Sequence, residues 1–304
     1  MMLKNWTPEE SMYELRNGFM LEKAEAEEFP KFYVIYSNSN YFFSQSWDNS
    51  MSVIKAANSF YWIMKDNLRV GGVILRPNLI AKLFLIPPYT DTFQMLKAIK
   101  PVLLHWSDCS MNINAYEVLP KEIHSYHKMG FRTGETRRCM IRPTQSYNVE
   151  WEDKYQIIAP NMGHKLIIAE LFKAAYAGGV DSKKDDDENK HISFLEDYFN
   201  EEFEDKLINR ASALVFDKNT NELAASCLVS YWMGMPILED IAVLPLYQGR
   251  GLGEKLIKRA LSILNQNHAA MRLFVTIGNS AEALYYDLGF LPGEEFTNLY
   301  IAAE

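Results

Sequence analysis

The feature that most constrains the fold of this chain is a glycine-containing turn between a strand pattern and a helix pattern. Residues 238–244 form a short apolar run rich in β-favouring residues, and Pro245 cannot continue a strand ladder. Beyond the turn, apolar residues recur at helical spacing from Leu256 to Leu264, with charged residues on the other face. The sequence therefore predicts a buried strand, a turn and an amphipathic helix in succession.

The turn reads Gln248-Gly249-Arg250-Gly251-Leu252-Gly253. Three glycines at alternate positions leave backbone N–H groups uncovered, and the next helix adds the positive end of its dipole, so a phosphate or pyrophosphate suits this turn. A Walker loop needs Ser or Thr after Gly-Lys, whereas Glu254 and Lys255 follow here. The dinucleotide pattern fails because its third glycine would fall on Glu254 or Leu256. From these six residues alone, a strand-to-helix turn that binds no ligand is an alternative interpretation.

The turn resembles the acyl-coenzyme-A loop of the GNAT acetyltransferase superfamily, Gln/Arg-x-x-Gly-x-Gly/Ala after a strand, and the match is complete. A second segment, residues 278–290, is similar to the family's Asn-x-x-Ala/Glu…Leu-Tyr-x-x-x-Gly-Phe segment and follows another β-like run over residues 271–277. Its Asn279 and Glu282 also form a helix start resembling a capping box. The two segments stand in the family's order, with a helix and a strand between them.

The resemblance implies transfer of an acetyl group from acetyl-CoA, a cosubstrate, to a primary amine by direct attack in a ternary complex. It implies that main-chain N–H groups hold the pyrophosphate at Gln248, Gly249, Arg250, Gly251, Leu252 and Gly253. It also implies that the backbone of Ile241, Ala242 and Val243 pairs with the pantetheine amides and helps to polarise the thioester carbonyl. Asn279 would reach the pantetheine arm, and its role as a helix cap is an equal alternative.

The same resemblance places Tyr285 near the coenzyme sulfur, where its hydroxyl would hydrogen-bond the leaving thiolate. The alternative for Tyr285 is an aromatic residue of the core. An ammonium acceptor must lose a proton before attack, and the candidate bases are Glu239 and Asp240. Since consecutive strand residues point to opposite faces, at most one of the two faces the cleft. A solvated carboxylate pair at a strand end is the alternative.

Charge is concentrated in one stretch. Residues 178–205 carry eleven Asp or Glu and three Lys, which accounts for the net charge of −8 of the whole chain. This stretch lies where GNAT proteins carry the segment over the acceptor site, so a cationic acceptor would be attracted to it, although a solvated loop is the alternative. Nucleic acid is not expected as a partner, because the chain has no basic excess.

Several classes of protein are not expected from composition. The chain has no run of about 18 apolar residues and no signal-peptide pattern at its start, so we expect no membrane partner and a cytoplasmic protein. Its three cysteines form no CxxC pair, and His124 and His127 lack a third ligand, so we expect neither a disulfide framework nor a metal site. The oligomeric state is not indicated.

The periodicities predict an α/β (α+β) protein. Together with the apparent duplication, the resemblance implies two tandem GNAT-like domains, each a mixed, mostly antiparallel twisted sheet flanked by helices. We expect a domain over 1–142, a linker over 143–153 and a domain over 154–304. Expected helices cover 7–28, 49–57, 92–104, 120–129, 163–177, 192–209, 254–264 and 279–288. Expected extended segments cover 31–36, 41–46, 59–65, 68–76, 79–86, 112–118, 135–142, 155–159, 213–216, 223–231, 238–244, 271–277 and 297–302.

Two short matches indicate a duplication. Ile86-Pro-Pro-Tyr89 aligns with Leu244-Pro-Leu-Tyr247 at an offset of 158 residues, and the Tyr126 to Phe131 segment aligns with Tyr285 to Phe290 at 159. The first copy lacks the glycine loop and has Asp91 where a pyrophosphate would lie, so it is expected to bind no coenzyme. The alternatives to an enzyme are a non-catalytic acyl-CoA-binding or sensing module and a protein-interaction scaffold.

Overall fold

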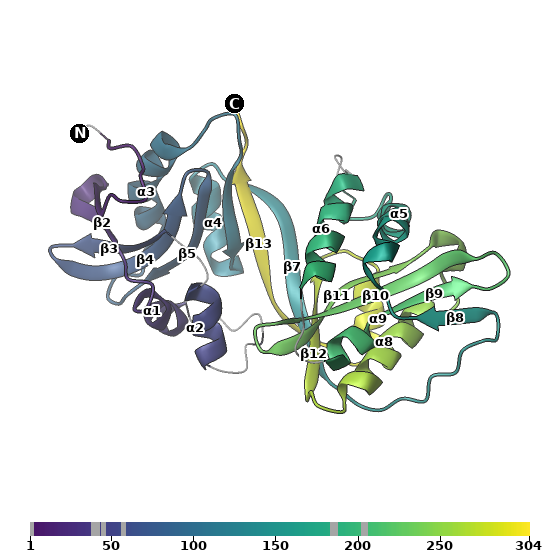
Figure 1. Ribbon diagram of the computed structural model, residues 1–304. Coiled ribbons are helices and arrows are strands. Elements are labelled where there is room, and N and C mark those ends of the chain that lie inside the picture. The colour runs from purple at the N-terminus through teal and green to yellow at the C-terminus, as the bar shows by residue number, and fades with distance from the viewer. Residues whose placement is uncertain (1–2, 38–42, 44–46, 56–58, 183–187, 202–205) are drawn as a thin grey trace. The chain divides into compact units, whose positions relative to one another are not determined.

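The computed structural model of the protein describes residues 3–37, 43, 47–55, 59–182, 188–201 and 206–304 (Figure 1). The chain forms two compact units. The first contains Met1–Arg137 and Glu294–Glu304, and the second contains Arg138–Gly293. Each unit combines helices with a mixed, mostly antiparallel sheet, so the expected fold class is confirmed.

The first unit begins with a strand pair and contains four described α-helices. Its elements are β1 (Met12–Glu14), η1 (Arg16–Gly18), β2 (Phe19–Lys23), α1 (Phe29–Tyr36), α2 (Trp47–Lys55), β3 (Phe60–Lys65), β4 (Leu68–Arg76), β5 (Leu79–Leu85), α3 (Thr92–Trp106), β6 (Ile113–Val118) and α4 (Pro120–Lys128). The strand order is β1-β2-β3-β4-β5-β6-β13, in which β5 and β6 pair in parallel and the other described registers are antiparallel.

The second unit repeats this succession of elements. They are β8 (Tyr155–Ile158), η2 (Met162–His164), α5 (Lys165–Tyr176), α6 (Glu188–Asn200), α7 (Lys206–Ala211), β9 (Ala213–Asp217), β10 (Glu222–Trp232), β11 (Met235–Val243), η3 (Pro245–Tyr247), α8 (Leu252–Leu264), β12 (Ala270–Thr276) and α9 (Ala281–Asp287). The strand order is β8-β9-β10-β11-β12-β7, and β11 pairs with β12 in parallel. In both units a meander is followed by a helix, a parallel strand and a short helix.

The last strand of each unit comes from the other half of the sequence. β13 (Leu291–Ile301) pairs antiparallel with β6 of the first unit, and β7 (Arg132–Pro143) lies beside β12 in the second. The structure therefore divides the chain differently from the expected domains 1–142 and 154–304. One boundary lies at Arg138 rather than in 143–153, and residues 294–304 join the first unit because β13 completes its sheet.

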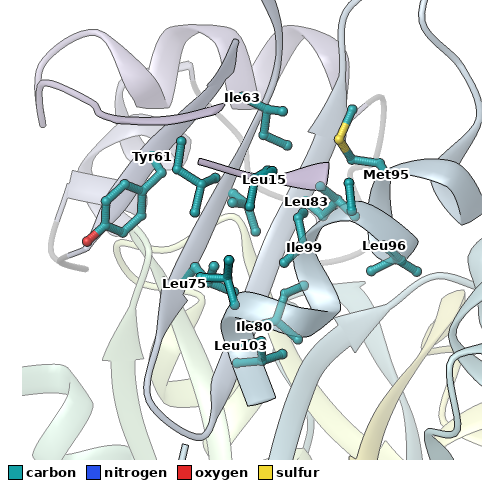
Figure 2. Close-up of a cluster of buried hydrophobic side chains, with 14 of the residues drawn as sticks. Leu15, Tyr61, Ile63, Leu75, Ile80, Leu83, Met95, Leu96, Ile99 and Leu103 are labelled. Carbon is teal, nitrogen blue, oxygen red and sulfur yellow. The ribbon is translucent and has the colours of Figure 1, made fainter. Parts of the chain in front are cut away.

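Each sheet is covered on both faces. In the second unit α5 and α6 lie on one face and α8 on the other, each over its own apolar cluster (Figure 1). In the first unit α3 packs one face through Met95, Leu96, Ile99 and Leu103, which Figure 2 shows against side chains of the strands. The opposite face carries a second cluster around Phe29. Burial of apolar surface on both sides of each sheet is the main stabilising contribution.

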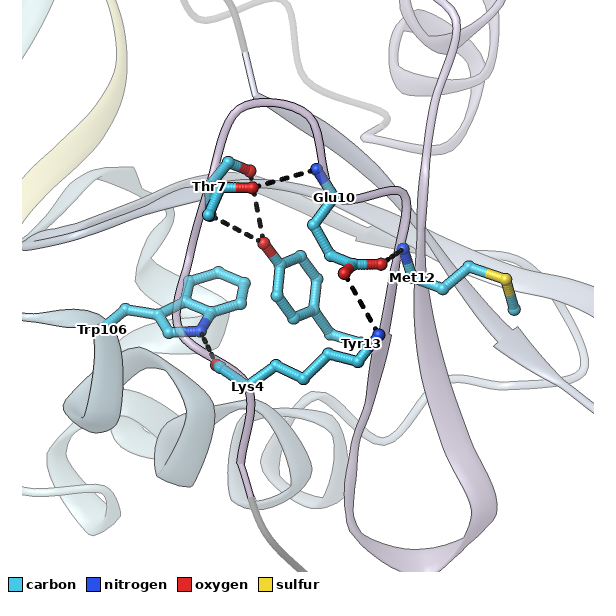
Figure 3. Close-up of polar contacts among 6 residues, drawn as sticks. All are labelled: Lys4, Thr7, Glu10, Met12, Tyr13 and Trp106. Carbon is cyan, nitrogen blue, oxygen red and sulfur yellow. Dashed lines mark hydrogen bonds and ion pairs between the residues drawn. The ribbon is translucent and has the colours of Figure 1, made fainter.

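The helix expected over residues 7–28 is wrong. Thr7 does not cap a helix: its hydroxyl accepts a hydrogen bond from the Glu10 N–H at 3.2 Å, and the Tyr13 hydroxyl accepts one from the Thr7 N–H at 3.0 Å (Figure 3). Asn17 and Gly18, both at positive φ, then turn the chain between β1 and β2. Asn-Gly is a strong hairpin signal, and it outweighs the helix-start pattern at Thr7.

One further expectation near the N-terminus is wrong, and two others are tested only in part. The extended segment expected over 31–36 is helix α1, because its aromatic residues recur at helical spacing and pack onto the sheet: Phe29 contacts Trp62 and Phe84 with ring centroids 5.6 and 5.4 Å apart. The strand expected over 41–46 lies outside the described residues apart from Phe43. The helix expected over 192–209 is instead α6 and α7, with residues 202–205 outside the description.

The strand exchange makes β13 structurally important to the first unit. Leu299 is 1% exposed in the first unit's core, whereas Leu291 on the same strand is 62% exposed. We predict that Leu299→Ala lowers the free energy of unfolding by about 2–5 kcal/mol through the lost burial and the cavity left behind. Leu291→Ala should leave it within about 0.5 kcal/mol. Urea denaturation measures both, and equal effects would contradict the placement of β13.

Candidate active site

A β-bulge interrupts the register between β10 and β11, two central strands of the second unit. The register between β10 and β11 pairs Leu228 with Asp240 and Val229 with Leu238, which leaves Glu239 as the extra residue. The parallel register between β11 and β12 contains only the pairs at Ile237 and Leu238. Residues 239–243 therefore continue along β10 beyond the register that β11 shares with β12, and one edge of this segment is open for another strand-like group.

The open edge presents backbone donors. The Leu244 N–H donates to the Ala224 carbonyl oxygen at 2.9 Å, so by alternation along an antiparallel strand Ile241 and Val243 point their backbone groups away from β10. The carbonyl of Ile241 accepts from the Tyr176 hydroxyl at 3.1 Å, and that of Val243 accepts from Gln248 Nε2 at 3.2 Å. With these carbonyls engaged, the N–H groups at both positions suit an amide-bearing ligand laid along the strand.

The glycine loop begins where this strand ends. Gly249 and Gly251 have φ of 73° and 75°, and a Cβ at either position would meet nothing within 4 Å. Both glycines are therefore required for conformation and both border open space. Gly253 differs, because it lies inside α8 and a Cβ there would make ordinary contacts with Leu284 and Val243. Two of the three glycines, Gly249 and Gly251, thus have a backbone conformation that favours glycine, whereas Gly253 does not.

The loop leads into the N-terminus of α8. At this end the Lys255 N–H donates to the Gly251 carbonyl oxygen at 3.0 Å, so the N–H groups of Leu252, Gly253 and Glu254 have no acceptor within the helix. Tyr247 anchors the start of the loop: it is buried, and its hydroxyl donates to the Glu222 carboxylate at 3.1 Å. Free N–H groups on a fixed helix end form an anion site that fits a pyrophosphate.

Asp240 belongs to a buried polar cluster. Its carboxyl is hydrogen-bonded to the Tyr176 hydroxyl, which also contacts the Ile241 carbonyl oxygen. Burial raises the pKa of Asp240 to about 7, against the lowering effect of the Tyr176 hydrogen bond. In its protonated form Asp240 can donate to Tyr176 while Tyr176 donates to Ile241. The cluster thus fixes the backbone at the bulge.

Tyr285 lies on α9 beside this cluster. Its ring is 7% exposed and packs edge-on to Phe290 with centroids 6.1 Å apart, so it is also a core residue. Burial and then the charge of Asp240 raise the pKa of Tyr285 well above its usual value. The phenol therefore keeps its proton at neutral pH and acts as a hydrogen-bond donor. Among the described residues, its hydroxyl makes no hydrogen bond, which leaves the proton available to a ligand.

Asn279 lies at the start of α9, and its expected contact with the pantetheine arm stays a prediction. Its side-chain oxygen accepts from the Ala281 N–H at 2.8 Å, which caps α9, and its amide donates to the Asp181 carboxylate. Asp181 also contributes to raising the pKa values of Tyr176 and Tyr285, so it lies in the same cluster. Tyr176 was not predicted as a site residue, and Asp181 was expected only as part of the acidic stretch. The position of Tyr176 just before Ala177-Gly178-Gly179, at a helix end, was the available signal.

Glu239 and Asp240 lie in different environments. Asp240 is part of the tyrosine cluster, whereas Glu239 accepts a hydrogen bond from the Ser230 hydroxyl at 2.7 Å and lines a cavity of about 480 Å³. The cavity also contains Asp197 and Glu201, and burial together with Glu239 raises the pKa of Glu201. The rest of its lining is mainly aromatic or apolar: Phe194, Tyr198, Tyr231, Trp232, Ile237 and Phe274. This lining suits a cation with an apolar body.

The acidic stretch is only partly described. Asp185, Asp186, Asp187, Glu202, Glu204 and Asp205 lie outside the described residues. Within the described part of the chain, no cluster of three His, Cys, Asp or Glu residues could hold a metal ion. No helix in that part is both long and apolar enough to cross a membrane.

The two kinds of glycine can be separated by substitution. We predict that Gly251→Ala lowers the free energy of unfolding by about 1 kcal/mol, because an alanine at φ near 75° is strained although nothing would clash. Gly253→Ala should leave stability unchanged or slightly higher, since the position is helical. Urea denaturation of both variants is the measurement. A larger loss for Gly253→Ala would contradict the assignment.

The raised pKa of Asp240 makes stability depend on pH. Between about pH 4 and pH 7 an unfolded Asp240 has lost its proton while the folded one keeps it, so this residue's contribution to stability falls as the pH rises. Asp240→Asn removes that dependence. We predict that the variant gains at least about 2 kcal/mol relative to the natural protein as the pH approaches 7, since each unit of raised pKa corresponds to about 1.4 kcal/mol. The control is Asp287→Asn, at an exposed position; a pH-independent difference for Asp240→Asn would refute the prediction.

Comparison with known proteins agrees with this geometry. Residues 180–290 match the model of the acetyltransferase (GNAT) family. They contain the bulged strand, the glycine loop, α8 and α9. Among curated proteins, none matches the sequence at a significant level.

Solved structures of similar fold span nearly the whole chain. A GCN5-related N-acetyltransferase from Sphaerobacter thermophilus aligns with a TM-score of 0.66 at 11% identity, covering 94% of this chain and 96% of its own. A tandem GNAT protein from the clavulanic acid biosynthesis pathway, without AcCoA, aligns with a TM-score of 0.56 at 11% identity, covering 94% and 99%. A GNAT-family acetyltransferase from Colwellia psychrerythraea gives 0.55 at 11%, covering 93% and 98%. The chain thus has the GNAT fold along nearly its whole length, and residues 180–290 carry the sequence pattern of the GNAT acetyltransferase family.

Proposed function

We propose that the second unit is an acetyl-CoA-dependent N-acetyltransferase that moves an acetyl group to a primary amine by direct attack in a ternary complex. The observation that carries this proposal is the bulge at Glu239, which leaves an open donor edge leading directly into the glycine loop and the N-terminus of α8. Acetyl-CoA would supply the activated acetyl thioester. The matching family model supports the acyl-transfer class.

The coenzyme would bind through backbone groups. The N–H groups of the loop and of the first turn of α8 would hold the pyrophosphate, and those of Ile241 and Val243 would pair with the pantetheine amides. One of these strand N–H groups would also polarise the thioester carbonyl by donating to its oxygen. Asn279 is oriented by Asp181 and by its cap on α9, so its role would be to hold the loop before α9 in place.

The side chains would divide the proton transfers. Tyr285 would donate a hydrogen bond to the leaving thiolate, since its raised pKa makes it a donor rather than a strong acid. Glu239 lines the acceptor cavity and would take the proton of the ammonium group, directly or through water. Asp240 would act as a positioning residue through Tyr176 and the Ile241 carbonyl. In this proposal Glu239 is the base and Asp240 a positioning residue, whereas the sequence left both as candidate bases.

The acceptor would be a cationic amine with an apolar or aromatic body. Three carboxylates, those of Asp197, Glu201 and Glu239, line the cavity, and among the described residues no Lys, Arg or His lines it. The aromatic rings around them can contact a methylene chain or an ammonium face. Attraction to this acidic cavity would weaken as salt is added.

The decisive experiment is a screen for thiol release from acetyl-CoA. The purified protein is incubated with acetyl-CoA and primary amines of increasing apolar size, with the matching carboxylic acids as controls. The proposal expects release of free coenzyme A, dependent on amines and suppressed in Glu239→Gln through a lowered kcat, because the base that takes the ammonium proton is lost. Tight binding of acetyl-CoA without turnover on any amine would favour a non-catalytic binding or sensing module, and no binding would leave only a scaffold.

The role of Tyr285 can be tested against its neighbour. Tyr285→Phe should lower the acetyl-transfer rate at least about tenfold while leaving acetyl-CoA affinity unchanged, because only the hydrogen bond to the leaving group is lost. Tyr286→Phe is the matched control, since Tyr286 is 66% exposed on the same helix. Steady-state kinetics with calorimetry separates rate from affinity. An unchanged rate in Tyr285→Phe would remove the assignment.

The first unit is proposed to bind no coenzyme. Asp91 caps α3, and its carboxylate accepts from the Gln94 N–H at 3.0 Å, so a negative charge already lies at the helix end where an anion would bind. Isothermal titration should therefore give one equivalent of acetyl-CoA per chain, unchanged in Asp91→Asn. A second equivalent would contradict the proposed loss of function in this unit.

A further inference from the structure

The first unit contains a cavity that the proposed acetyl transfer does not use. Its volume is about 310 Å³, within the range of roughly 300–1,000 Å³ usual for small-molecule sites. It lies where β5 and β6 cease to pair: the last parallel pair joins Ala81 to Tyr116, and the next residues on the two strands, Lys82 and Glu117, line the cavity. The cavity occupies the place in this unit that the open strand edge has in the second.

An ion pair joins these two residues at the cavity. Lys82 Nζ contacts the Glu117 carboxylate, and the side chains are only 15% and 26% exposed. Burial lowers the pKa of Lys82 to about 7, which reflects the cost of removing its charge from water. A buried pair of this kind is weak evidence for stability, because its desolvation offsets the attraction. A role other than stabilising the unit is therefore indicated.

The backbone at both positions is strained. Lys82 has φ of 53° and Glu117 has φ of 58°, in the left-handed region that side-chain-bearing residues seldom adopt. The Glu117 N–H donates to the Asn298 side chain at 3.1 Å, so β13 holds this conformation. Residues in such conformations cluster at ligand sites, where the surrounding structure enforces them. Here two of them face each other across one cavity.

The other lining groups set the chemistry of the ligand. Lys121 and Glu122 add a second positive and a second negative residue, so the lining has no net charge. Burial raises the pKa of the Glu122 carboxyl. A ligand with a single charge would pair with either Lys82 or Glu117 and leave the other buried charge without a counterion. A ligand carrying both charges would satisfy Lys82 and Glu117 together.

Aromatic rings form much of the remaining wall. The Tyr33 ring centroid is 5.6 Å from Lys82 Nζ, the Tyr36 ring stacks on Phe84 with an interplanar angle of 6°, and Tyr126 is fully buried behind them. Such rings favour a flat apolar group through stacking and edge contacts. The carboxylate of Asp91 at the adjacent helix end argues against a diphosphate.

We propose that this cavity binds an α-amino acid with an aromatic side chain, whose carboxylate pairs with Lys82, whose ammonium pairs with Glu117, and whose ring lies among Tyr33, Tyr36 and Phe84. The ligand separates the ion pair and replaces each partner with one of its own charges. Binding needs neither acetyl-CoA nor the second unit's site, so the proposal stands or falls independently of the acetyltransferase.

The test is calorimetric titration of the full chain, without acetyl-CoA, with L-phenylalanine, L-tyrosine, L-tryptophan and L-histidine. Phenethylamine and 3-phenylpropionate, which each lack one charge, are the ligand controls. At least one of the four amino acids should bind, and at least tenfold more tightly than either control. No heat from any amino acid at millimolar concentration, or equal binding of a singly charged control, would overturn the proposal.

Two variants locate the site. The double variant Lys82→Met with Glu117→Leu removes both poles without leaving an unpaired buried charge, and should weaken binding at least tenfold. Tyr36→Ala, which keeps the ion pair, should weaken it several-fold and serves if the double variant does not fold by circular dichroism. Lys97→Met, an exposed change on α3, is the matched control and should leave binding unchanged. Full affinity in a folded double variant, or in Tyr36→Ala should the double variant not fold, would overturn the proposal.

Discussion

The site in the second unit depends on how little β11 and β12 pair. Two residue pairs join these parallel strands, at Ile237 and Leu238, and the bulge at Glu239 then separates them. Had the pairing continued, the N–H groups of Ile241 and Val243 would be used within the sheet, as in an ordinary parallel ladder. The bulge thus exchanges hydrogen bonds of the sheet for an edge that can bind another molecule. Tyr176 and Asp240 hold that edge from one side.

The two units show how one plan accommodates different chemistry. In each, a central strand separates from its parallel neighbour and leads to a helix N-terminus. In the second unit that end has Gly251 and uncovered N–H groups, whereas in the first Asp91 occupies it. Charge at a helix end decides whether an anion is accepted there. In the first unit the charged residues Lys82 and Glu117 lie where β5 and β6 cease to pair, and they line the cavity there.

Much of this fold could be predicted from periodicity and turn chemistry. The meander strands β3, β4 and β5 and the helices α3, α4 and α8 lie close to where the sequence indicated, because each has a clear apolar period and a Gly, Pro or Asn at its end. The N-terminal segment was mispredicted because the Thr7 pattern is common to helix caps and loops. The Asn17-Gly18 hairpin signal and the long-range contact between Tyr13 and Trp106 both favour the strand pair. Local patterns encode the first of these but not the second.

For the candidate site, the sequence could place the loop and Tyr285 but not the cluster around Asp240. The positions of Glu239 and Asp240 in different environments follow from the bulge, and a one-residue shift in register has no local sequence signal. Tyr176 and Asp181 are distant in sequence from the strand they contact. The ion pair of Lys82 and Glu117 was likewise hidden, since it depends on two strands 35 residues apart being adjacent.

The exchange of the last strands affects the order in which the chain can fold during synthesis. The second unit needs residues 138–293, whereas the first needs residues 294–304 as well as its own N-terminal segment. The half translated first therefore remains an incomplete sheet, with β6 exposed as an unpaired edge, until residues 291–301 have left the ribosome. The sheet of the first unit is thus completed only after all residues of the second unit have been synthesised.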